Sequence, residues 1–169
     1  LIVGYGAIAE RLVELLAPFK MTIKAMRRSP RGDEQVTVVT PDEVEGALAE
    51  ADHVINILPD NAASKNWFDA KRFGQMKAGS IFYNIGRGTT VDQDDLAAAL
   101  KSGHLGAAWL DVTDPEPLPD DHVLWTFENC HITPHTAGGQ YDEARVLVRH
   151  FLENFARYQK GEKLVNRVM

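Results

Sequence analysis

Cysteine and long apolar runs are scarce in this chain of 169 residues, and each shortage excludes a class of protein. Cys130 is the single cysteine of the sequence, so no disulfide can form within the chain, and we expect a reducing, cytoplasmic location. No apolar run approaches the roughly 20 residues that cross a bilayer, and no secretory signal is visible, so we expect no membrane partner. The net charge of −6 gives no reason to expect a nucleic-acid partner. No group of residues has the spacing of metal ligands.

The composition that remains is that of an ordinary globular protein. Apolar residues make up 44% and charged residues 25% of the chain, and 169 residues suffice for one domain with a substantial core. Leu1 stands inside the first apolar run, and no Met precedes it. We therefore expect the sequence to be part of a longer chain.

Short apolar runs alternate with amphipathic segments along most of the chain. We expect strands over residues 1–3, 21–26, 36–39, 53–58, 80–85, 107–112 and 130–133. We expect helices over residues 7–16, 41–50 (with Thr40 as N-cap), 64–75 and 139–159, and one more that Asp92 caps and Gly103 ends. The first helix has an apolar stripe made of Ile8, Leu12, Leu15, Leu16 and Phe19. The alternation predicts an α/β fold with a doubly wound parallel sheet, typical of a Rossmann-type dinucleotide-binding domain.

A glycine-rich turn, Gly4-Tyr5-Gly6-Ala7-Ile8-Ala9, joins the first expected strand to the first helix. Gly4 would permit the tight turn, Gly6 would let the backbone approach a pyrophosphate, and Ala9 would let helix and strand pack closely. The helix N-terminus then offers free N–H groups and its positive dipole end to the phosphates. A purely structural turn is the alternative, but the strand–turn–helix context favours a dinucleotide site.

The end of the second expected strand bears on which dinucleotide binds. NAD sites usually place an acidic residue there, about 20 residues past the glycines, to hold the ribose 2′-hydroxyl. This chain has Met26-Arg27-Arg28-Ser29 instead. Because arginines attract a 2′-phosphate, the segment predicts that NADP is preferred and that NAD is possible. A solvated basic loop in an enzyme that accepts both cofactors is the alternative.

Three chemically active side chains each follow an expected strand. Arg87 comes after the run 80–85, Glu116 after the run 107–112, and His135 after the run 130–133. Since the carboxyl ends of neighbouring parallel strands meet at one edge of a sheet, we expect these side chains to gather there. A turn arginine, a solvated loop carboxylate and a helix-start histidine are the structural alternatives.

Four segments stand in a characteristic order along the chain: Gly4-Tyr5-Gly6-Ala7-Ile8-Ala9, Asn84-Ile85-Gly86-Arg87-Gly88, residues 110–119 and residues 133–138. Together they resemble the D-isomer-specific 2-hydroxyacid dehydrogenases, and the resemblance covers nearly the whole chain. With arginines at 27 and 28, the chain most resembles the glyoxylate/hydroxypyruvate reductase branch of that family.

The resemblance implies a role for each side chain. Arg87 would bind the carboxylate and carbonyl oxygens of the substrate, His135 would act as acid/base, and Glu116 would hydrogen-bond His135. Asp111 would contact the nicotinamide carboxamide, with Thr113 also lining that pocket. The cofactor-binding residues expected in full are Gly4, Tyr5, Gly6, Ala7, Ile8, Arg27, Arg28, Ser29, Leu58, Pro59, Ile85, Gly86, Arg87, Asp111, His135, Ala137 and Gly138.

The resemblance also implies an organisation and a reaction. Residues 1–150 would form the NAD(P)-binding Rossmann domain, and residues 151–169 a tail that returns toward a substrate domain whose N-terminal part is absent from this sequence. The expected assembly is a homodimer joined through the nucleotide-binding domain. The expected reaction is hydride transfer between NADP(H) and a small 2-keto or 2-hydroxy acid, of the glyoxylate or hydroxypyruvate type.

Two other functions are compatible with the same fold. A β-hydroxyacid dehydrogenase would need a catalytic lysine, for which Lys65, Lys71 and Lys77 are available. A cofactor-sensing, catalytically weak dinucleotide-binding module would need only the nucleotide pocket. The arginine, glutamate and histidine have no evident role in either, and they favour the 2-keto acid oxidoreductase.

Overall fold

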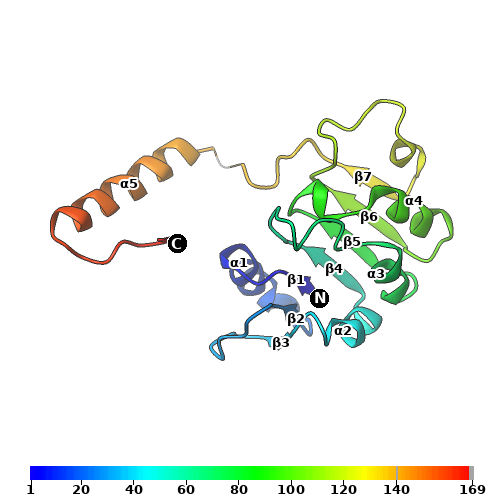
Figure 1. The fold of residues 1–169 in the computed structure, drawn as a ribbon, viewed down its shortest axis with the longest axis horizontal. Helices are drawn as coiled ribbons and strands as arrows, with labels where there is room; N and C mark the ends of the chain where they lie inside the picture. Colours follow the sequence, from blue (N-terminus) through cyan, green and yellow to red (C-terminus); the bar gives the residue numbers. More distant parts are fainter. Residues whose placement is uncertain (140, 168–169) are drawn as a thin grey trace. The chain divides into compact units, whose positions relative to one another are not determined.

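The computed structural model describes residues 1–139 and 141–167, and the chain divides into a compact unit over residues 1–135 and a second unit that starts at Thr136 (Figure 1). The first unit contains a parallel sheet of seven strands in the order β3-β2-β1-β4-β5-β6-β7. The strand order reverses between β1 and β4, as in doubly wound sheets. The predicted fold class is therefore confirmed. The strands are β1 (Ile2–Val3), β2 (Lys24–Met26), β3 (Thr37–Val39), β4 (His53–Asn56), β5 (Ile81–Asn84), β6 (Ala107–Leu110) and β7 (Cys130–Ile132).

Helices connect most of these strands. The first, α1, covers the residues predicted for it, and Asp92 caps α4 as predicted, since its carboxylate accepts a hydrogen bond from the Asp95 N–H at 3.1 Å. Gly103, with φ of +73°, follows the end of α4. The helices are α1 (Ala7–Leu16), α2 (Val44–Glu50), α3 (Ala70–Gln75), α4 (Gln93–Lys101) and α5 (Glu143–Gln159), with 3₁₀ turns η1 (Ala17–Phe19), η2 (Gly88–Thr90) and η3 (Val123–Thr126).

The helix predicted over residues 64–75 is wrong in its first half, because α3 begins only at Ala70. Phe68 is extended and forms an isolated parallel bridge with Val91. Its N–H bonds the Thr90 carbonyl at 3.0 Å, and its carbonyl accepts the Asp92 N–H at 2.9 Å. Asp69 then caps α3. Pairing with a distant segment has overridden the local helical pattern.

Two other helices begin later than predicted. The Glu43 carboxylate bonds the Thr40 N–H at 3.0 Å and its hydroxyl at 2.8 Å, which closes residues 40–43 as a turn before α2. The α5 helix begins at Glu143 rather than 139, because the Gly139 N–H bonds the Thr136 carbonyl in a turn. Gln140 lies outside the described residues.

The two faces of the sheet are covered unequally. The α2–α3–α4 face packs a large buried cluster in which Phe68, Phe73 and Phe82 contact one another through their rings. The α1 face buries a smaller cluster made of Ile2, Tyr5, Ala9, Val13 and Ala25. Right-handed crossovers explain why three helices share one face, since the connections β3–β4, β4–β5 and β5–β6 all run in the same direction along the sheet.

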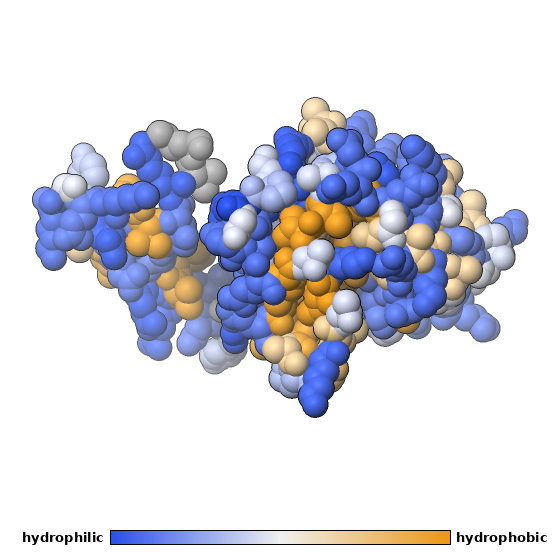
Figure 2. Space-filling model, turned by 90° about the horizontal axis from the view of Figure 1, so that it is seen from below, coloured by the Kyte–Doolittle hydropathy of each residue, from blue (hydrophilic) through white to orange (hydrophobic). Residues whose placement is uncertain are grey.

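The apolar stripe predicted on α1 is largely exposed. Ile8, Leu15 and Phe19 are 63%, 56% and 72% exposed, whereas Ala9 and Val13 are the buried residues of the helix. Beside this stripe is an apolar groove of about 480 Å³, and Figure 2 shows apolar side chains gathered on one side of the first unit. No helix in the described residues is long and apolar enough to cross a membrane. The residues lining the groove are Leu12, Leu16, Phe19, Met21, His53, Ile55, Tyr83 and Ile85.

Candidate active site and dinucleotide groove

The turn after β1 has the shape that the glycine motif predicts. Gly4 has φ of +101°, and a Cβ placed on it would lie 2.9 Å from the Ile57 carbonyl oxygen, so only glycine fits. Ala9 is fully buried where α1 approaches the sheet. Gly6 is the N-cap of α1, and no protein atom lies within 4 Å of the position that its Cβ would take. The space beside Gly6 at the start of α1 is therefore open, which leaves room for a pyrophosphate to approach the helix N-terminus.

A groove of about 330 Å³ lies beside this turn, between the carboxyl ends of β1 and β4. That is the point where the strand order reverses and where open α/β sheets bind nucleotides. Several predicted cofactor residues line it, together with residues that were not predicted to bind a cofactor. The lining residues are Gly4, Tyr5, Met26, Arg27, Arg28, Pro41, Leu58, Pro59, Asn61, Ala63, Ser64 and Trp67.

The two arginines at the end of β2 have different surroundings. Arg27 Nη1 lies 3.2 Å from Glu34 Oε1, and both side chains are largely buried. The Glu34 carboxylate also accepts the N–H groups of Arg31 at 2.7 Å and of Gly32 at 2.8 Å, and the Arg31 hydrogen bond is the main cause that lowers the pKa of Glu34. Arg28 is exposed and lines the groove. The sequence pattern does not indicate Glu34, because it stands outside the glycine motif, seven residues after Arg27.

A buried polar network holds the segment that carries Arg87. The Asn84 side-chain amide donates to the Arg87 carbonyl at 3.1 Å, and the Thr90 hydroxyl donates to the same oxygen at 2.6 Å. Asn56 donates to Asn84 Oδ1 at 3.0 Å and to Thr90 Oγ1 at 2.7 Å. The Arg87 side chain itself is exposed, and its Nη1 donates to the Gly86 carbonyl at 2.7 Å. The Arg87 backbone is therefore held by buried hydrogen bonds, while its side chain is exposed to solvent.

The loop that carries Glu116 meets the Arg87 segment through the backbone. A Cβ placed on Gly88 would lie 1.9 Å from the Thr113 carbonyl oxygen, so no larger residue fits there. Thr113 and Leu118 are buried, and the residues between them, 114–117, are exposed. This close approach sets Glu116 near Arg87 in space although the two are far apart in sequence.

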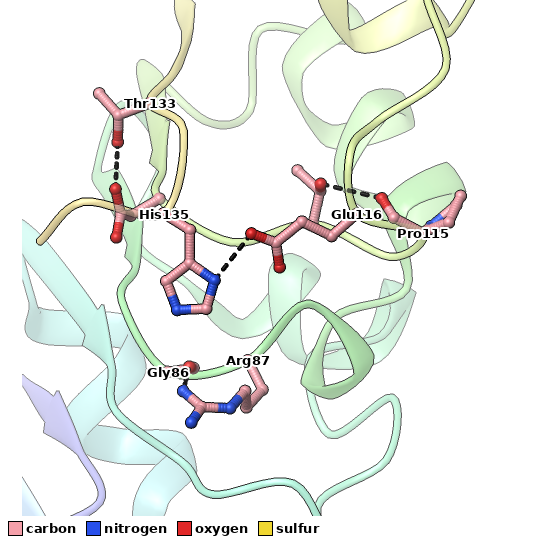
Figure 3. A network of polar contacts seen from close by, with 8 residues as sticks. Gly86, Arg87, Pro115, Glu116, Thr133 and His135 are labelled. Atoms are coloured by element: carbon pink, nitrogen blue, oxygen red, sulfur yellow. Dashed lines mark hydrogen bonds and ion pairs between the residues drawn. The ribbon is translucent and has the colours of Figure 1, made fainter. Parts of the chain in front are cut away.

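His135 and Glu116 form a direct hydrogen bond. His135 Nδ1 lies 2.7 Å from Glu116 Oε1, with 46% and 40% of the two side chains exposed (Figure 3). His135 has φ of +53°, a strained conformation that directs its side chain off the end of β7. In Figure 3 its ring points toward the segment that carries Gly86 and Arg87. With Nδ1 facing the carboxylate, Nε2 is the nitrogen that can exchange a proton with another molecule.

The remaining predicted residues are only partly gathered around this pair. Asp111 is buried at the end of β6 and accepts a hydrogen bond from the Thr133 hydroxyl at 2.5 Å. Ile85 and Gly86 follow β5, which ends at Asn84, one residue before the predicted end, and their contacts with a cofactor stay predictions. Ser29 and Ile8 are exposed and do not line the groove. The contacts predicted for Ala137 and Gly138, which belong to the second unit, stay predictions.

The lysines considered for β-hydroxyacid chemistry have other surroundings. Lys77 pairs with Asp52 at 2.6 Å, and Asp52 immediately precedes β4, at the amino edge of the sheet. Lys65 and Lys71 are exposed. None of these lysines lines the groove beside Gly4.

Comparison with known proteins gives the family. A family model described as "D-isomer specific 2-hydroxyacid dehydrogenase, NAD binding domain" matches residues 1–137. A Corynebacterium melassecola protein, described as "Uncharacterized protein in proB 3′ region", is 40% identical over 169 residues, which are 99% of this chain and 55% of that protein. The glyoxylate reductase/hydroxypyruvate reductase of Homo sapiens is 33% identical over 168 residues, which are 96% of this chain and 50% of the human protein.

The solved structures agree with the sequence relatives. An NADPH-dependent glyoxylate/hydroxypyruvate reductase from Sinorhizobium meliloti, in complex with NADP and sulfate, superposes with a TM-score of 0.90 at 28% identity, over 99% of this chain and 54% of that one. The chain spans about half the length of the curated relatives it matches. The predicted family is therefore confirmed: the chain belongs to the D-isomer specific 2-hydroxyacid dehydrogenases, and residues 1–137 match their NAD binding domain.

Proposed function

We propose that this chain is the dinucleotide-binding part of an oxidoreductase that reduces a small 2-keto acid, of the glyoxylate or hydroxypyruvate type, with NADPH. The observation that carries the proposal is the hydrogen bond of 2.7 Å between His135 and Glu116 at the edge of the sheet where Arg87 also emerges. A binding module needs the groove beside Gly4, but it has no use for an imidazole held by a carboxylate. The names of the human and Sinorhizobium meliloti relatives support the same reaction.

Each of the three side chains has a chemical task in this proposal. The planar guanidinium of Arg87 binds the substrate carboxylate and polarises the carbonyl oxygen. His135 gives a proton from Nε2 to that oxygen, while Nδ1 stays hydrogen-bonded to Glu116. Glu116 keeps the ring in one orientation and balances the charge of the imidazolium. Nicotinamide dinucleotide, when bound, supplies the hydride.

The cofactor-binding residues follow from the groove. The open N-terminus of α1 at Gly6 would hold the pyrophosphate, and Leu58 and Pro59 would flank the adenosine side. Arg28 would bind the 2′-phosphate of NADP, because it is exposed in the groove while Arg27 is paired with Glu34. NAD is accepted more weakly in this proposal, since it lacks that phosphate.

The wider organisation stays a prediction. We infer a substrate domain that supplies the second wall of the cleft, because Glu116 and His135 are 40% and 46% exposed, whereas hydride transfer needs positioning and exclusion of water. The predicted boundary at residue 150 falls inside α5, and the second unit already starts at Thr136. The homodimer and the cytoplasmic location stay predictions as well.

The test is a turnover assay of the purified protein with a panel of 2-keto acids and both reduced cofactors. We expect turnover with glyoxylate or hydroxypyruvate, more efficient with NADPH than with NADH. Arg87→Ala and His135→Ala should each lower turnover by about 10²- to 10⁴-fold. His131→Ala, an exposed histidine of β7, is the matched control and should be neutral. Unchanged turnover in both variants would overturn the catalytic assignment of Arg87 and His135, whereas cofactor binding without turnover in the wild type would favour the cofactor-sensing module.

A further inference from the structure

The loop that carries Glu116 has few ways to be held in place. Residues 114–117 are exposed, so packing does not fix them. Pro115 and Pro117 have no N–H group, which leaves Asp114 and Glu116 as the backbone donors of this stretch. A group that binds the Asp114 backbone is therefore expected to determine the position of residues 114–117, including Glu116.

Gln93 makes that contact in both directions. Its Nε2 donates to the Asp114 carbonyl at 2.6 Å, and its Oε1 accepts the Asp114 N–H at 3.0 Å. A side-chain amide carries a donor and an acceptor side by side, so it can bind both the N–H and the carbonyl of one backbone residue. Gln93 is the first residue of α4, and the capping of that helix is performed by Asp92. The Gln93 side chain is thus not needed to start the helix.

The contact between Gln93 and Asp114 lies next to the place where the Arg87 segment meets the Glu116 loop. Gly88 touches Thr113 from the Arg87 side, and Gln93 binds the next residue, Asp114, from the start of α4. The Thr113 hydroxyl also donates to the Pro115 carbonyl at 3.0 Å. Two residues beyond Asp114, the Glu116 carboxylate meets His135 (Figure 3).

We propose that Gln93 is a positioning residue: it holds the Asp114 backbone so that Glu116 stands within hydrogen-bonding distance of His135. The proposal rests on the proposed function for its kinetic consequence, but the contact itself does not depend on which substrate is used. Gln93 acts through Glu116 and touches neither substrate nor cofactor in this proposal.

The test is a double-mutant cycle on the purified protein with Gln93→Met, Glu116→Gln and the two together. We expect Gln93→Met to lower kcat by about ten- to hundredfold, because small displacements of a catalytic group are costly, with KM for NADPH unchanged. The double variant should be within about twofold of Glu116→Gln alone, since Gln93 then has nothing left to position. Asp94→Met, the exposed neighbour on α4, is the matched control and should be neutral.

A conservative variant and a spectroscopic signal separate positioning from a loss of folding. Gln93→Glu keeps an acceptor for the Asp114 N–H but sets its second carboxylate oxygen against the Asp114 carbonyl, so its kcat should fall at least as far as that of Gln93→Met. The ¹⁵N chemical shifts of the His135 ring, at one fixed pH, should change in Gln93→Met in the same direction as in Glu116→Gln.

The outcomes distinguish the two proposals. Independent, multiplying effects of Gln93→Met and Glu116→Gln would overturn the role of Gln93, as would wild-type His135 shifts in Gln93→Met when Glu116→Gln alters them. If no 2-keto acid is turned over by the wild type, the proposed function fails, and the His135 shifts still decide whether Gln93 positions Glu116.

Discussion

Around β1, β2 and β4 the carboxyl edge of the sheet leaves a groove of about 330 Å³, whereas around β5, β6 and β7 the same edge brings side chains into direct hydrogen bonds. The first region is shaped by a glycine turn and an open helix N-terminus, so it offers space and N–H groups to a ligand. The second is shaped by two loops whose backbones touch at Gly88 and Thr113. We call the first the binding region and the second the reacting region, after their parts in the proposed function, and a substitution in either should leave the other intact.

Of these substitutions, Gly88→Ala should have the largest effect on stability and turnover, because it disturbs the reacting region. The added methyl group has no room beside Thr113, so the two loops must separate, and we expect a loss of about 3 kcal/mol or more in the free energy of unfolding. Turnover should fall with it, while the dinucleotide affinity of the folded protein stays within about twofold. Urea unfolding and cofactor titration measure both quantities. Gly46→Ala in α2 is the control: its Cβ meets open space, and it should stabilise the protein by up to about 1 kcal/mol.

Arg28→Ala should act on the binding region alone. Loss of a charge-assisted hydrogen bond to the 2′-phosphate should raise KM for NADPH by about ten- to hundredfold, with KM for NADH and kcat unchanged. Arg27→Ala should have a smaller effect on KM, because Arg27 is already paired with Glu34. Steady-state kinetics with both cofactors decide between the two arginines. Equal losses for NADPH and NADH in Arg28→Ala would contradict the 2′-phosphate assignment.

Acid should weaken cofactor binding through protonation of Glu34. Hydrogen bonds from Arg31 and Gly32 hold the pKa of Glu34 below its ordinary value of 4.5. A lowered pKa means that the stabilisation is complete above the unfolded value and is lost as pH falls through the folded one. NADPH affinity, measured by fluorescence titration, should therefore decline as the pH drops below about 4.5. Glu34→Gln should have the weaker affinity already at neutral pH and should lose this pH dependence.

The smallest effect is expected from an alkylating reagent that targets Cys130, the first residue of β7. Burial raises the pKa of its thiol to about 11, so the thiol stays protonated at neutral pH. Iodoacetamide should label the folded protein slowly at pH 8 and the unfolded protein fast. The folded protein should keep its turnover for as long as Cys130 is unlabelled. Rapid labelling of the folded protein would show that β7 opens more readily than the rest of the sheet.

The sequence predicts the fold and the reacting pair better than it predicts their supports. Arg87, Glu116 and His135 each follow an apolar run, and parallel strands place such residues at one edge. Glu34, Gln93 and the network of Asn56, Asn84 and Thr90 could not be found in this way. Their partners are distant or non-periodic, and hydrogen bonds between loops leave no pattern in the sequence. The only signal was the presence of asparagines within two apolar runs, at positions 56 and 84.

The wrong helix start has the same physical origin. Residues 64–69 have a helical pattern, but Phe68 gains more by pairing with Val91 and burying its ring among Phe73 and Phe82. Tertiary packing decided the conformation, and local propensity did not. The stripe on α1 is the converse case, because its helical spacing is real although most of it is not in the core.

The touching backbones at Gly88 and Thr113 limit how this site can be redesigned. An engineer who wants a different substrate cannot graft a side chain onto residue 88, since even a methyl group would collide with the opposite carbonyl. Nor can either loop be lengthened there without pulling the other away. New specificity has to be introduced on side chains that project from the loops into solvent. The backbone contact between Gly88 and Thr113 has to stay unchanged.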